Sequence, residues 1–140
     1  MKRINNRSGF TLLEIIIVII IVGVLASLAM PRFFTTINFS RATEALNAMG
    51  VAKRAADRCS IMAGAATGTV VFTNCVTFAQ IGMEDPGTVP GASFTYATAF
   101  ATPNWSITAT RAAGHTITLT YNTTSGAITR AGTGDFAGIQ

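Results

Sequence analysis

An apolar run near the amino terminus constrains this chain more than any other feature. From Phe10 to Met30 the only polar side chains are Thr11, Glu14 and Ser27. An α-helix rises about 1.5 Å per residue, so the run predicts a helix roughly 30 Å long, which matches the hydrocarbon thickness of a bilayer. The chain is 49% hydrophobic and only 11% charged, too apolar for an ordinary small soluble domain. We therefore expect a segment that inserts into a membrane or an assembly.

The basic residues before this run set its orientation. Lys2, Arg3 and Arg7 carry most of the formal net charge of +4, and a basic flank stays in the cytoplasm while the rest of the chain is exported. Without these residues the chain is nearly neutral and has no basic patch for phosphate groups. Stable binding to nucleic acid is therefore not expected.

One interpretation of the run is an ordinary secretory signal. Ser27-Leu28-Ala29 would be its small-x-small cleavage site, and the exported product would be a soluble binding domain beginning at Met30. Two features count against this interpretation. The run is longer than the usual 7 to 15 residues or so of a signal core, and it carries Glu14 without a physical reason.

The stretch "RSGFTLLE" supports a different interpretation. A short basic leader ends in Gly9, Phe10 follows, and Glu14 stands four residues later, before the apolar helix. In this combination the chain resembles the bacterial type IV pilins and the related pseudopilins. The resemblance implies that residues 1–9 are a leader, which a prepilin peptidase removes by cutting between Gly9 and Phe10. It also implies N-methylation of the new amino terminus at Phe10.

Such a cut would explain the carboxylate in the apolar run. It creates a cationic amine at Phe10, and a carboxylate in hydrocarbon needs such a partner because its burial is costly. Positions 10 and 14 are one helical turn apart, so the pair could form within one chain. In the related pilins, the favoured partner is the amine of a neighbouring subunit, which sets the axial register. A third interpretation is that Glu14 matters only to the processing enzyme.

Two residues interrupt the helical pattern. Gly23 lowers helix propensity, and Pro31 removes a backbone hydrogen bond, so the stretch between them should be the most flexible part of the segment. The resemblance implies that this stretch unwinds when subunits pack into a fibre. A simple kink at Pro31 remains the alternative.

The apolar run must be kept out of water, and this requirement predicts which partners the chain has. Outside the bilayer, only other copies of the same helix can cover it, and head-to-tail copies form an open filament. We expect a homopolymer of pilin subunits. The resemblance adds an inner-membrane assembly platform as a partner, with single-pass residence in the inner membrane before assembly and an extracellular pilus afterwards.

The rest of the chain predicts a long helix packed on a sheet. Residues 10–30 form the transmembrane half of the helix, residues 31–63 the amphipathic half, residues 64–92 a connecting loop with a short helical turn at 78–81, and residues 93–140 an antiparallel sheet and tail. The apolar stripe of the second half comprises Ala42, Ala45, Leu46, Met49, Ala52, Ala56 and Cys59. Gly64 is the predicted stop of this helix. Four alternating segments predict the strands: "SFTYATAF", "WSITATR", "TITLTYN" and "AITRAG". The turn signals between them are Pro103-Asn104, Ala113-Gly114 and Ser125-Gly126. The fold class is α+β, and the architecture resembles the pilin fold.

Cys59 and Cys75 are the only cysteines. If they are exported, as the basic flank indicates, a disulfide between them is favoured over free thiols. It would close a loop of about 15 residues and stabilise the fold by about 3 kcal/mol.

Catalytic patterns are not apparent. The chain has one histidine, His115 beside a glycine turn, and its acidic residues show no metal-ligand spacing, so we expect no enzyme activity, cofactor or metal. We expect a structural subunit of a type IV pilus for adhesion, twitching motility or DNA uptake. The alternative within the same superfamily is a type II secretion pseudopilin. Its major form has a calcium site of carboxylates near the carboxyl terminus, where this chain offers only Asp135.

Overall fold

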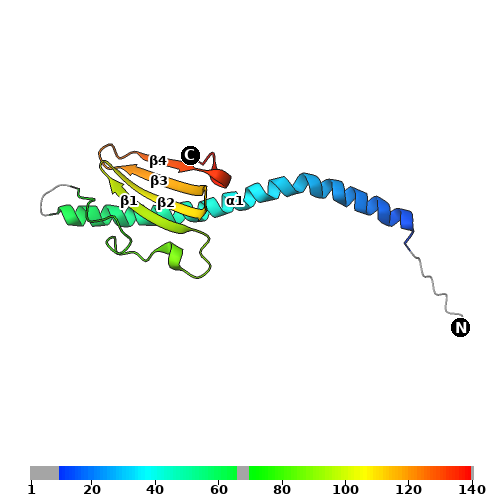
Figure 1. Ribbon diagram of the computed structural model, residues 1–140, viewed down its shortest axis with the longest axis horizontal. Coiled ribbons are helices and arrows are strands. Elements are labelled where there is room, and N and C mark those ends of the chain that lie inside the picture. Colours follow the sequence, from blue (N-terminus) through cyan, green and yellow to red (C-terminus); the bar gives the residue numbers. More distant parts are fainter. Residues whose placement is uncertain (1–9, 66–69, 140) are drawn as a thin grey trace, which may run out of the picture. The chain divides into compact units, whose positions relative to one another are not determined.

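The computed structural model describes residues 10–65 and 70–139, in two units that meet between Ile37 and Asn38. Helix α1 (Leu12–Gly64) contributes to both units. The remaining elements all lie in the second unit (Figure 1): η1 (Pro86–Thr88), β1 (Thr95–Ala101), β2 (Asn104–Ala112), β3 (His115–Asn122), β4 (Ile128–Gly132) and η2 (Gly134–Phe136). One long apolar N-terminal helix with a four-stranded antiparallel sheet confirms the predicted α+β class.

The carboxyl-terminal half of α1 buries five of the seven residues of the predicted stripe, whereas Leu46 and Cys59 are only partly buried against the core. Its most buried side chains are small, with Met49 the largest, and they recur every three or four residues. Small side chains let the helix backbone approach a sheet closely. The buried residues are Ala42, Ala45, Met49, Ala52, Ala55, Ala56, Ser60 and Gly64. The helix ends at Gly64, the stop that the sequence predicted.

The sheet is a simple antiparallel meander with the order β1-β2-β3-β4. Alternate residues of β2 and β3 face the core, where Ile107 pairs with Leu119 and Ala109 with Ile117. Figure 1 shows this sheet alongside the carboxyl-terminal half of α1. The core therefore forms between the alanine stripe of the helix and one face of the sheet.

Glycines form two of the hairpin turns. Gly114 (φ +84°) joins β2 to β3, and Gly126 (φ +73°) lies between β3 and β4, both at predicted turns. The third turn differs slightly from the prediction. It was expected at Pro103-Asn104, but Asn104 already belongs to β2 and the turn contains a cis Thr102–Pro103 peptide.

The segment between helix and sheet holds more structure than the sequence indicated. The predicted turn at 78–81 is a single helical turn, in which the Ile81 N–H donates to the Thr77 carbonyl at 3.1 Å. The 3-10 helix η1 was not predicted. The Asp85 carboxylate caps it by accepting the Gly87 N–H at 2.8 Å.

The carboxyl-terminal segment packs onto the core through η2. Phe136 is only 2% exposed, and its ring centroid lies 5.5 Å from that of Phe94. The chain crosses tightly over Gly132, where an added Cβ would lie 1.9 Å from the Phe136 carbonyl oxygen. Only glycine fits there without a backbone shift.

Candidate functional site: the exposed N-terminal half of α1

The first turn of α1 is capped by Thr11. The Glu14 N–H donates to the Thr11 carbonyl at 3.1 Å and to the Thr11 hydroxyl at 3.3 Å. Thr11 and Glu14 have the T-x-x-E spacing of a capping box. The negative charge of an acidic residue in the first turn also interacts favourably with the helix dipole. The Thr11 side chain therefore caps the helix, and the Glu14 carboxylate lies in the first turn, where the helix dipole stabilises a negative charge; neither role was predicted from the sequence although the spacing was visible.

The side chains of residues 10–36 are all exposed. An 18-residue window of α1 in this region has a mean hydropathy of 3.0, and none of it is buried. Among the large hydrophobic side chains of this region, the exposed fraction ranges from 41% for Ile16 to 78% for Phe10. A surface this apolar is far larger than soluble monomers leave in water. By length and composition, this part of α1 can cross a membrane.

Polar groups inside this surface are satisfied by the helix itself. The Ser27 hydroxyl donates to the Val24 carbonyl at 2.8 Å, and the Thr35 hydroxyl to the Pro31 carbonyl at 3.1 Å. Such bonds remove the cost of placing a hydroxyl in an apolar environment.

The charged side chains of Glu14 and Arg32 differ from these hydroxyl groups, because no described residue pairs with either of them. The Glu14 carboxylate is exposed, and it forms no ion pair within residues 10–65 and 70–139. Phe10 lies at the same end of the helix, whereas Gly9 lies outside the described residues. The site therefore presents one carboxylate that can bind a cation from outside this unit.

Gly23 and Pro31 both lie within the assigned span of α1. A Cβ added at Gly23 would meet nothing within 4 Å, so no contact within the chain requires glycine at this position. Pro31 lacks the N–H that would bond to the carbonyl four residues earlier.

Cys59 and Cys75 are joined by a disulfide with a Cα–Cα distance of 5.8 Å. It connects the last turns of α1 to the segment before η1. Cys75 is fully buried, and its carbonyl accepts the indole N–H of Trp105 at 3.2 Å. The bridge therefore fastens the helix end to the core of the second unit.

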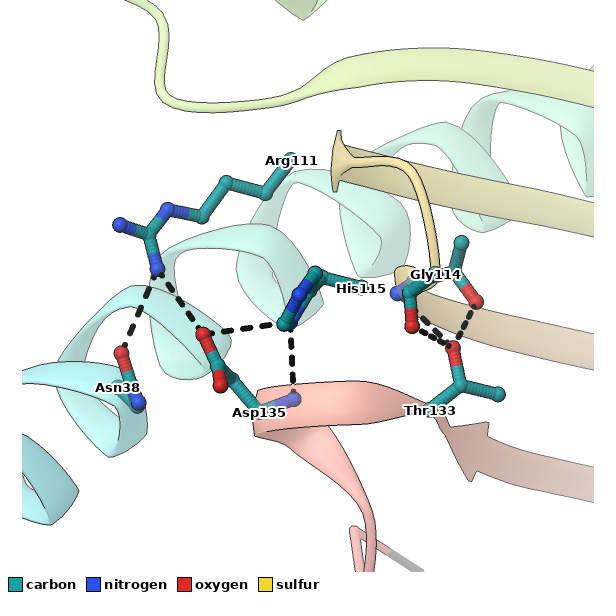
Figure 2. Close-up of polar contacts among 7 residues, drawn as sticks. Asn38, Arg111, Gly114, His115, Thr133 and Asp135 are labelled. Carbon is teal, nitrogen blue, oxygen red and sulfur yellow. Dashed lines mark hydrogen bonds and ion pairs between the residues drawn. The ribbon is translucent and has the colours of Figure 1, made fainter.

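A polar cluster that the sequence did not predict lies where the second unit begins. Arg111 donates to the Asn38 side-chain oxygen at 3.4 Å and lies 3.5 Å from the Asp135 carboxylate. His115 Nδ1 accepts the Asp135 N–H at 3.0 Å and lies 3.2 Å from the same carboxylate (Figure 2). The cluster ties α1, the β2–β3 hairpin and η2 together.

Its members are far apart in the sequence and form no local motif, so no sequence signal could have found the cluster. Asp135 faces Arg111 and His115 rather than other carboxylates, which does not suit a calcium ion. Across residues 10–65 and 70–139, no group of three histidine, cysteine or acidic side chains is placed to hold a metal.

Comparisons with known proteins identify the N-terminal pattern. Residues 4–30 match the family model of the prokaryotic N-terminal methylation motif. No solved structure matches the chain significantly.

Two proteins of Moraxella bovis are similar to part of the chain. Fimbrial protein Q is 40% identical over 53 residues, which cover 38% of this chain and 34% of that protein. A type IV major alpha-pilin is also 40% identical over 53 residues, covering 38% of this chain and 33% of the relative. The matches thus span about a third of the length of each relative.

Proposed function

We propose that this chain is a type IV pilin, a structural subunit that polymerises through the N-terminal half of α1 into a surface fibre. The methylation motif at residues 4–30 and the two relatives named as a fimbrial protein and a type IV major alpha-pilin support this identity. The observation that carries the proposal is the exposed apolar surface of residues 10–36 on a chain whose second unit has its own core.

The proposed processing follows from the motif. Prepilin peptidase removes residues 1–9 by cutting between Gly9 and Phe10, and Phe10 is then N-methylated. The new amine supplies the cation that Glu14 lacks within the described residues. A subunit is added to the fibre base when its Glu14 meets the amine of a neighbour, which fixes the axial register.

Residues 10–30 hold the subunit in the inner membrane before assembly, and the assembly platform then moves it into the fibre. Residues 31–63, 64–92 and 93–140 make the part that is exported. Gly23 and Pro31 lower the stability of the helix between them, which allows this stretch to unwind in the fibre. The role is structural, and the fibre serves adhesion, twitching motility or DNA uptake.

Fibres sheared from cells test this function. We expect electron microscopy to show fibres in which this chain is the main protein, and a strain lacking the chain to lose them. Persistence of the same fibres without the chain would overturn the proposal. Short structures confined to the periplasm would assign it to the pseudopilins instead.

Glu14→Gln separates the roles of this side chain. Glutamine keeps the capping pattern but not the charge. A variant that is cleaved at Phe10 yet absent from fibres supports the register role. A variant that is not cleaved would restrict Glu14 to the processing enzyme.

A further inference from the structure

One face of the carboxyl-terminal half of α1 remains without a partner in the second unit. It carries Val51, Arg54, Arg58 and Met62, spaced three or four residues apart, and we call it the basic stripe. Val51 is 46% exposed and Met62 is 77% exposed. Arg54 and Arg58 are also exposed, and neither forms a hydrogen bond or ion pair with any described residue.

Lys53, on the adjacent face of the helix, differs from Arg54 and Arg58 because it is paired within the subunit. Its ammonium group lies 2.6 Å from the Asp57 carboxylate and 4.1 Å from the centroid of the Tyr121 ring. The cation that faces the sheet is thus paired inside the subunit. Arg54 and Arg58 line a shallow hollow together with Asp57, but neither forms an ion pair with any described residue.

An acidic hollow of about 270 Å³ lies elsewhere on the same unit. Glu44 of α1 lines it together with Tyr96 and with Pro86, Val89 and Pro90 of the segment around η1. Burial raises the pKa of Tyr96, with further contributions from the charges of Glu44 and Asp85. Two carboxylates therefore act on one phenol, and no described cation pairs with either of them.

The two surfaces are complementary in chemistry but separated along the helix. Glu44 precedes Arg54 by ten positions, which is about 15 Å of helix rise, and the structure contains no ion pair between them. Each surface combines unpaired charge with exposed apolar side chains, Val51 and Met62 on one and Val89 on the other. Such surfaces are typical of a contact between two molecules.

We infer that the basic stripe of one copy docks on the acidic hollow of a second copy, with Arg54 and Arg58 facing Glu44. This inference rests on the proposed fibre, which brings many copies of the second unit together. The contact uses different surfaces on its two partners, so it is heterologous and repeats without closing, as a filament requires. Burial of the apolar helix does not fix how two copies are oriented, whereas pairing of opposite charges favours one orientation of the second units.

Charge reversal in the full-length chain tests the contact. We expect Arg54→Glu with Arg58→Glu to reduce the yield of sheared fibres by about tenfold or more, because like charges then face each other. The single change Glu44→Arg should act in the same direction. Combining Glu44→Arg with the two arginine reversals should restore most of the yield. Arg130 on β4 is exposed and forms no ion pair with any described residue, so Arg130→Glu is the matched control and should leave the yield unchanged.

The amount of each variant in the membrane, measured by immunoblotting, separates folding from assembly. Arginine reversals that assemble as well as the control would overturn the docking proposal while leaving the pilin function intact. Reversals that reduce assembly without rescue in the combined variant would overturn the pairing of these two surfaces. If the wild-type chain formed no fibres at all, the proposed function itself would be refuted.

Cross-linking gives a readout that does not depend on fibre yield. With Arg58→Cys and Glu44→Cys in one chain, we expect oxidised fibres to give a ladder of covalent oligomers on non-reducing gels. Oxidised fibres carrying Arg130→Cys and Glu44→Cys should give only the monomer band on the same gels. A monomer band alone from the chain with Arg58→Cys and Glu44→Cys would contradict the contact. Retention of DNA by wild-type fibres that is lost in assembly-competent arginine reversals would assign the basic stripe to an acidic polymer instead.

Discussion

The two halves of α1 share one helix but differ in what covers them. Residues 10–36 present large aliphatic side chains that are all exposed, whereas residues 42–60 bury mainly alanines beneath the sheet. The second half is covered by its own chain, whereas no described residue covers the first half. This difference is the basis of the proposal that the first half is covered by lipid and then by other copies.

A charge placed in each half should give the largest contrast. Ala52→Asp puts an unpaired carboxylate where no side-chain surface is exposed, and we expect it to destabilise the second unit by about 3–5 kcal/mol. Ile19→Asp, at a 61% exposed position, should leave that stability unchanged but reduce membrane insertion. Urea unfolding in detergent can be followed by the fluorescence of Trp105, the only tryptophan and fully buried.

Asn47→Asp, on the exposed face of the covered half, is the control for the charge itself. Equal destabilisation by Ala52→Asp and Asn47→Asp would contradict the burial of the alanine stripe.

Removal of the disulfide should weaken only the covered half. Cys59→Ser with Cys75→Ser is expected to lower the free energy of unfolding by about 3 kcal/mol, because the open chain gains conformational freedom. The shift in urea midpoint measures this loss. An unchanged midpoint would show that the bridge does not stabilise the fold.

Two glycine-to-alanine substitutions, one in each unit, should have opposite effects on stability. Gly132→Ala should destabilise the second unit by about 1–3 kcal/mol, because its Cβ overlaps the Phe136 carbonyl. Gly23→Ala meets open space, so it should stabilise the helix by up to about 1 kcal/mol. Thermal unfolding measures the first effect and circular dichroism in detergent the second. A stabilising Gly132→Ala would contradict the close crossing at η2.

The smallest effect concerns alkaline pH. Burial, together with Glu44 and Asp85, raises the pKa of Tyr96 above its usual value of 10.0. The unfolded chain therefore loses this proton first, so the stabilisation is complete below pH 10 and is lost as pH rises through the raised pKa. Absorbance titration of wild type and Tyr96→Phe should show that the variant lacks a late-ionising phenol. Identical late titration in both would contradict the acidic hollow.

The sequence predicted the features that depend on local pattern. The alanine stripe, the stop at Gly64, the four strands and two glycine turns follow from periodicity and turn chemistry, and all appear close to their predicted positions. The capping role of Thr11 was also visible in the sequence, although it was not recognised.

Features that depend on folding of distant segments were not predictable. Arg111, His115 and Asp135 meet Asn38 only because the hairpin, η2 and α1 converge there. The burial of Phe136 and the requirement for Gly132 arise from the same crossing of the tail. The proposed register role of Glu14 would depend on a second chain, which the fold of one subunit does not contain.

The amino terminus of the chain in purified fibres tests the central claim most directly. Intact mass and N-terminal sequencing by mass spectrometry should give a chain that begins at methylated Phe10 and retains the whole apolar half of α1. An exported chain that begins at Met30, soluble and without the helix, would contradict the claim that this half remains attached and is covered by other copies.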